Sequence, residues 1–132
     1  MSYQITRGSD ERPSIALADE PPFCVALDAA PTAREPELDR GWWLVMVFAT
    51  WSAHDVAAIQ TALDVAKHFC GDIKLGLRPF DLAEEHAAWC PTLGDERRSP
   101  LWLLLHDGDI RMSRGGLLTT DALIAGIEAA RR

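Results

Sequence analysis

Ser52, His54 and Asp55 are the three residue types of a hydrolytic triad, and they stand within four consecutive positions of the chain. A triad needs its serine, histidine and acid in one line of hydrogen bonds. Here the three residues open a predicted helix, on which residues one and two apart do not face each other. The cluster therefore cannot form a triad by itself, and we expect His54 to be a solvated surface residue.

Histidines and cysteines are the residues that could bind a transition metal. They are His54, His68, His86, His106, Cys24, Cys70 and Cys90. Structural zinc sites use pairs of such residues at close spacing. The nearest histidine and cysteine, His68 and Cys70, are two apart at the end of a predicted helix and diverge. We therefore predict separate surface histidines, no metal site and no cofactor.

The three cysteines are an odd number without a CxxC pair, so they do not make a disulfide framework and suit a reducing compartment. We expect Cys24 and Cys70 to be packing thiols. Cys90 stands in a loop with Arg97 and Arg98, whose charges could stabilise a thiolate. Two interpretations of Cys90 stay open: a packing thiol, or the reactive group of a single-thiol redox sensor or thiol-dependent enzyme.

Composition limits the partners. The chain has 132 residues, enough for one domain, and 20 acidic against 13 basic residues give a net charge of −7. An acidic protein repels phosphate backbones, so we expect no nucleic-acid partner. The longest apolar run, Trp42–Ala49, is far shorter than the roughly 20 residues that span a bilayer. With no signal-peptide pattern in residues 1–20, the sequence predicts a cytoplasmic protein without membrane association.

The elements that must position these residues follow from hydrophobic periodicity. Residues 1–20 carry scattered prolines and charges, which predicts a loosely ordered lead-in with a short edge strand at Ser14–Ala18. Residues 21–132 form the predicted domain. Its expected strands are Phe23–Leu27, Trp42–Ala49, Ile73–Phe80, Leu101–Leu105 and Ile110–Arg114, and its expected helices are Pro31–Arg40, Ala53–Phe69, Asp81–Trp89 and a last helix that begins at Thr119 or Thr120.

The order of these elements predicts an α/β fold. Trp42–Ala49 is apolar at every position, which is typical of a strand buried on both faces of a sheet. Strands that alternate with helices imply parallel pairing, and the Asp107-Gly108 turn predicts an antiparallel hairpin at the end of the chain. We therefore expect a three-layer α/β/α sandwich with a mixed central sheet.

Residues 23–130 resemble the thioredoxin family in element order and in a few fixed residues. Redox-active members end an apolar strand with Trp-Cys-Gly-Pro-Cys, and Trp51-Ser52-Ala53-His54-Asp55 stands in that place here. Ser99-Pro100 precedes an apolar strand where the family has a cis-proline, so the resemblance implies a cis bond. Gly108 and Gly116 match the turn glycine and the glycine before the last helix.

The departures from the family concern its redox chemistry. Ser52 and Asp55 occupy the two cysteine positions, and Met46 stands where the family buries an aspartate behind the dithiol. The resemblance therefore implies a redox-inactive member without disulfide oxidoreductase activity. Ser52 can instead cap the helix, and Asp55 can reach back as in a variant of the capping box.

The resemblance also implies a binding surface. In the family, an extended peptide of a client protein binds across positions that correspond to Trp51, Phe80, Ser99, Pro100, Gly116 and Leu117. Strand-like recognition of a peptide needs no cysteine. The implied function is a protein-binding, chaperone or assembly-accessory module, and relatives without the dithiol include accessory proteins that escort subunits during hydrogenase maturation. A structural subunit of a larger complex is the other alternative, and the long 91–98 loop lies beside the expected groove.

Overall fold

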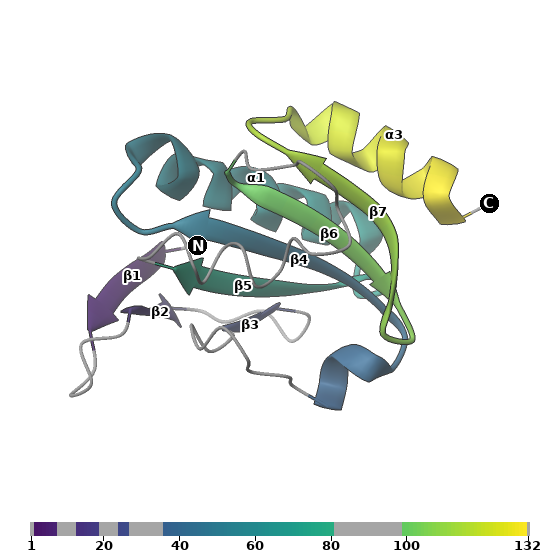
Figure 1. Ribbon diagram of the computed structural model, residues 1–132, viewed down its shortest axis with the longest axis horizontal. Coiled ribbons are helices and arrows are strands. Elements are labelled where there is room, and N and C mark those ends of the chain that lie inside the picture. Colours follow the sequence, from purple (N-terminus) through teal and green to yellow (C-terminus); the bar gives the residue numbers. More distant parts are fainter. Residues whose placement is uncertain (1, 8–12, 19–23, 27–35, 81–98, 132) are drawn as a thin grey trace.

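The computed structural model describes residues 2–7, 13–18, 24–26, 36–80 and 99–131 (Figure 1). Along the chain the elements are β1 (Ser2–Arg7), β2 (Pro13–Ala18), β3 (Cys24–Ala26), the 3-10 helix η1 (Pro36–Asp39), β4 (Trp42–Ala49), α1 (Ala53–Phe69), β5 (Lys74–Phe80), β6 (Leu101–His106), β7 (Asp109–Gly115) and α3 (Thr120–Arg131). The fold is α/β, as the sequence predicts.

A five-stranded mixed sheet organises the fold, with the strand order β3-β5-β4-β6-β7. β5 pairs in parallel with both β3 and β4, and helix α1 makes the crossover between β4 and β5. β6 pairs antiparallel with β4 and with β7. β1 and β2 form a separate antiparallel two-stranded sheet.

β4 lies at the centre of the sheet, and every residue from Trp43 to Ala49 is buried. Leu44, Met46 and Phe48 face the helices, whereas the alternate residues from Trp43 to Ala49 join a second apolar cluster on the other face. That second cluster includes Leu38 of η1 and three leucines of β6. Both faces of the central strand are thus buried, which explains why it carries no polar alternation.

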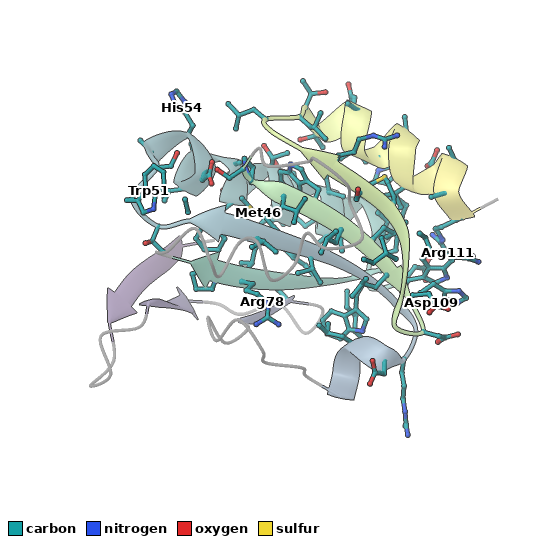
Figure 2. All side chains as sticks on the ribbon, viewed as in Figure 1. Met46, Trp51, His54, Arg78, Asp109 and Arg111 are labelled. Carbon is teal, nitrogen blue, oxygen red and sulfur yellow. The ribbon has the colours of Figure 1, made fainter. Side chains whose placement is uncertain are left out.

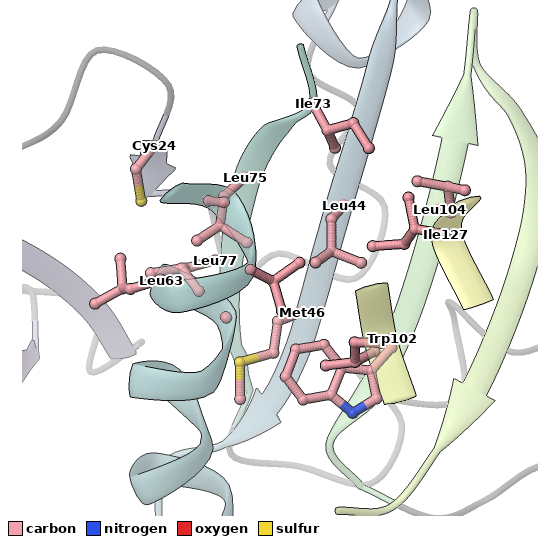
Figure 3. Close-up of a cluster of buried hydrophobic side chains, with 14 of the residues drawn as sticks. Cys24, Leu44, Met46, Leu63, Ile73, Leu75, Leu77, Trp102, Leu104 and Ile127 are labelled. Carbon is pink, nitrogen blue, oxygen red and sulfur yellow. The ribbon is translucent and has the colours of Figure 1, made fainter. Parts of the chain in front are cut away.

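Helices α1 and α3 pack on one face of the sheet around a shared core (Figure 3). α1 contributes apolar side chains at helical spacing, among them Ile59 and Leu63, and α3 contributes Leu123 and Ile127. These residues meet Leu75 and other apolar side chains of the central strands. The core therefore fixes where each helix begins relative to the end of its preceding strand.

The β6–β7 hairpin turns at Asp107 and Gly108, which have φ angles of +50° and +87°. Positive φ at both central residues is the pattern of a type I′ turn, which the Asp-Gly pair favours. The backbone N–H of Gly41 donates to the Asp107 carboxylate at 2.8 Å, so the turn is also tied to the segment that enters β4. This confirms the hairpin that the sequence predicts.

Other predicted elements are found with shifted bounds. The expected Pro31–Arg40 helix is, within the described residues, only the 3-10 turn of η1, because Pro36 lacks the N–H that a continuing α-helix needs. The expected edge strand at Ser14–Ala18 is found as β2, and its partner β1 has no counterpart among the predicted elements. The expected Asp81–Trp89 helix and the 91–98 loop lie outside the described residues.

Among the described residues, no helix combines the length and the apolar character that crossing a membrane requires.

Candidate functional site

The candidate site lies where β4 ends and α1 begins. Ser52 is the N-cap of α1, with extended backbone angles (φ −99°, ψ 115°), and its Oγ accepts a hydrogen bond from the backbone N–H of Asp55 at 3.3 Å. This confirms the predicted helix cap. Thr50 and Trp51 form the turn between the strand and the cap.

The Asp55 side chain differs from its predicted role. In a capping box the acid accepts from the backbone N–H of the N-cap residue, but here the Ser52 N–H donates to the Ala49 carbonyl at 3.3 Å. The Asp55 carboxylate instead turns inward, where it is 2% exposed, and its Oδ2 accepts from the Ala49 N–H at 2.8 Å. Its Oδ1 receives a longer bond of 3.4 Å from the Ser52 hydroxyl. Asp55 therefore links the end of β4 to the first turn of α1.

The sequence could not reveal this bond. Ala49 contributes only a main-chain N–H, which carries no residue-type signal, and the fold must bring it within reach of a side chain six positions away. A buried acid is nevertheless costly unless it is hydrogen-bonded. The Ala49 N–H is thus a constituent of the site that residue types alone do not identify.

Trp51 projects from the turn into solvent (Figure 2), and 71% of it is exposed. His54, the second residue of α1, is also exposed, as predicted. The Ser52 hydroxyl bonds to Asp55 and not to His54, so the three residue types do not form a triad.

A second segment reaches the same edge of the sheet. The Ser99–Pro100 peptide bond is cis. The Gly116 N–H donates to the Pro100 carbonyl, and the Trp102 Nε1–H donates to the Gly116 carbonyl, both at 2.9 Å. These bonds hold the segment after β7 against the start of β6. Leu117, which follows, is 58% exposed.

Strand pairing brings the predicted binding positions together. Ala49 is opposite Phe80 on β5, and two residues earlier Val47 is opposite Leu101 at the start of β6. The carboxyl ends of β4 and β5 therefore meet the amino end of β6, and the residues predicted for the groove gather at that edge: Trp51, Phe80, Ser99, Pro100, Gly116 and Leu117. Among the residues whose side-chain burial the structure describes (Cys24, 38–79 and 99–131), Trp51 and Leu117 are two of the three large hydrophobic residues that are exposed.

The third is Ile110, which is 41% exposed and pairs with Leu105 at the opposite end of the β6–β7 hairpin. It offers a reference position of similar character that is remote from the edge with Trp51.

Met46 is fully buried among apolar side chains (Figure 3).

Cys24 is buried, as expected of a packing thiol. Cys70 is exposed, so the prediction that it is a packing thiol was wrong. Cys70 is the C-cap of α1 with a left-handed φ of +50°, which turns it out of the helix and away from the core. Cys90, Arg97 and Arg98 lie outside the described residues.

The described histidines lie in separate environments. His68 Nε2 is 3.8 Å from the Glu128 carboxylate, on the surface between α1 and α3. His106 stacks on Trp42 with ring centroids 4.1 Å apart. Within the described part of the chain, no three histidine, cysteine or acidic side chains are grouped as metal ligands would be; His86 is not among the described residues.

Comparison with known proteins adds a likeness of fold. No family model matches the chain, and no curated protein matches it. Among solved structures, the chain is similar to one titled as the structure of a malarial protein, with a TM-score of 0.52 and 16% sequence identity. The match covers 69% of this chain and 98% of that one. It supports the α/β fold and carries no information about activity.

Proposed function

We propose that this chain is a redox-inactive thioredoxin-like module that binds an extended segment of a client protein at the edge formed by Trp51, Ser99–Pro100 and Leu117. Support for the family comes from the mixed sheet and from the helix that begins directly after the central strand. Within this proposal the sheet is the middle of a three-layer α/β/α sandwich.

The observation that carries the binding function is the exposed Trp51 on a turn that is fixed from both sides. The Ala49 N–H and the Ser52 N–H, on either side of the turn, both make hydrogen bonds within this short segment. Tryptophan is one of the residue types enriched at positions that dominate binding energy. A side chain that is already ordered loses less conformational entropy on binding. A second exposed apolar residue, Leu117, lies at the same edge and extends the surface.

The residues at the former dithiol positions suit a binding role rather than thiol exchange. Ser52 and Asp55 are engaged in hydrogen bonds that shape the turn. In the family that the sequence resembles, main-chain groups of the residue before the proline, here Ser99, pair with an extended peptide in strand fashion. A chaperone or assembly-accessory role follows, and a maturation factor for a metalloenzyme such as a hydrogenase is its most specific form.

The test is selection of linear peptides displayed on phage against the full chain, followed by affinity measurement with the purified peptides. We expect Trp51→Ala to weaken the selected peptides at least about tenfold, equivalent to loss of about 1.4 kcal/mol of binding energy. Leu117→Ser should weaken them by a smaller factor.

Ile110→Ser is the matched control, because it removes an exposed isoleucine of similar size at the other end of the hairpin. It should leave the affinity unchanged. Peptides that bind the Trp51→Ala and Leu117→Ser proteins as well as the wild type would contradict the proposed site.

A further inference from the structure

We infer that Asp55 is a positioning residue for the proposed binding site: its buried carboxylate sets the orientation in which Trp51 is presented. The inference rests on the proposed function in one respect: an exposed tryptophan that is ordered before a partner arrives matters only if Trp51 binds that partner. The effect of Asp55 on the conformation of Trp51 can be tested without any partner.

The hydrogen bonds form a closed unit around the turn. The shortest is the one from the Ala49 N–H to Asp55 Oδ2, at 2.8 Å, in a buried environment. It fixes the last residue of β4 to a residue in the first turn of α1. The bond from the Ser52 N–H to the Ala49 carbonyl, at 3.3 Å, closes the same short loop a second time. Trp51 lies between the two tied residues, so its backbone has little freedom to turn.

In this inference, the hydrogen-bond acceptors of the Asp55 side chain, rather than its negative charge, hold the turn. Oδ2 must accept from Ala49, whereas the Ser52 hydroxyl can either donate or accept. An asparagine could therefore keep its carbonyl oxygen on the Ala49 N–H and direct its NH₂ group to Ser52 Oγ. The neutral and nearly isosteric variant should preserve the turn, whereas alanine removes the acceptor that Ala49 uses.

Fluorine NMR of protein labelled with 5-fluorotryptophan reports this directly. The chain has five tryptophans and should give five signals, and the Trp51 signal is assigned by its loss in Trp51→Phe. In the wild type we expect the Trp51 signal to be displaced from that of free 5-fluorotryptophan. In Asp55→Ala it should move toward the free position and relax more slowly, while the Trp102 signal, from a fully buried indole, stays in place.

Asp55→Asn should give the wild-type Trp51 signal, because asparagine keeps the acceptor oxygen. If the negative charge were needed, Asp55→Asn would instead give the signal of Asp55→Ala. Ser52→Ala removes only the longer bonds to Asp55 and should displace the signal less than Asp55→Ala. A Trp51 signal that is unchanged in folded Asp55→Ala, or that is already at the free position in the wild type, would overturn the inference.

Amide hydrogen exchange is the second measurement if Asp55→Ala does not fold. The Ala49 amide should be protected in the wild type and in Asp55→Asn, and rapid exchange of Ala49 in the folded wild type would overturn the inference. Affinity for a selected peptide should fall about two- to tenfold in Asp55→Ala, the cost of ordering one side chain on binding. Because the fluorine signal needs no peptide, a failed peptide selection would count against the proposed function and not against the role of Asp55.

Discussion

At the scale of single residues, three side chains determine the structure of the candidate site: Ser52, Asp55 and Met46. Ser52 caps α1, and the carboxylate of Asp55 is buried and accepts a hydrogen bond from the last residue of β4. Met46 is fully buried in the apolar core that β4 shares with α1. An apolar side chain at this position adds to the core.

Met46→Asp tests whether this position belongs to the apolar core. The substitution would bury a carboxyl group among side chains that offer it no hydrogen bond, and we expect it to lower the free energy of unfolding by at least about 4 kcal/mol or to prevent folding. Urea denaturation measures the change. Met46→Leu keeps the volume and should cost less than about 1.5 kcal/mol. A stable Met46→Asp protein would show that the position tolerates an acid.

At the scale of elements, the sequence predicted best where a single periodicity dominates. The continuous apolar run of β4 and the helical spacing of α1 gave both elements with correct bounds, because burial on two faces and burial on one stripe leave distinct patterns. Asp55 was assigned to a local capping box because sequence spacing reports only local bonds. Its actual partner is brought near by the β4–α1 turn.

Helix α3 contains a glycine that tests how tightly the helix is packed on β7. A Cβ added to Gly126 would lie 3.1 Å from the sulfur of Met112, which is tight, but that sulfur belongs to a flexible side chain. Alanine within a helix is favoured over glycine by about 0.8–1.0 kcal/mol. We expect Gly126→Ala to raise the free energy of unfolding by about 0.5 kcal/mol or more in urea denaturation.

A loss of stability in Gly126→Ala would instead mean that Met112 cannot yield. Replacing Met112 by valine, which has no atom at the δ position of the sulfur, in both the wild type and Gly126→Ala distinguishes the two cases.

At the scale of the whole molecule, the fold separates two ends with different properties. At one end of the sheet, Trp51 and Leu117 are exposed beside the cis bond. At the other end, the Trp42 ring stacks on His106. The Arg131 guanidinium lies over the same ring, 5.4 Å from its centroid, so Trp42 packs against residues of its own chain. The overall net charge of −7 favours association with neutral or basic partners.

The sequence predicted the α/β class, because strands that alternate with helices imply parallel pairing and a final hairpin adds antiparallel strands. It could not predict that Trp42 stacks on a histidine within the chain, nor that 71% of Trp51 is exposed. Trp42 and Trp51 are the same residue type near opposite ends of one strand. The contacts of Trp42 come from α3 and the hairpin, which are distant from it in sequence.

The most direct test of the binding function maps a bound peptide onto the ¹⁵N-labelled full chain by NMR titration, with the tightest peptide from the selection as the probe. We expect the largest shift changes at Trp51, Ser52, Ser99 and Leu117, with Ile110 and its neighbours in the hairpin unchanged. The same titration of Trp51→Ala should give small shifts at the same peptide concentration. Shift changes centred on Ile110 or on the Trp42 end of the sheet, with none at Trp51, would contradict the proposed function.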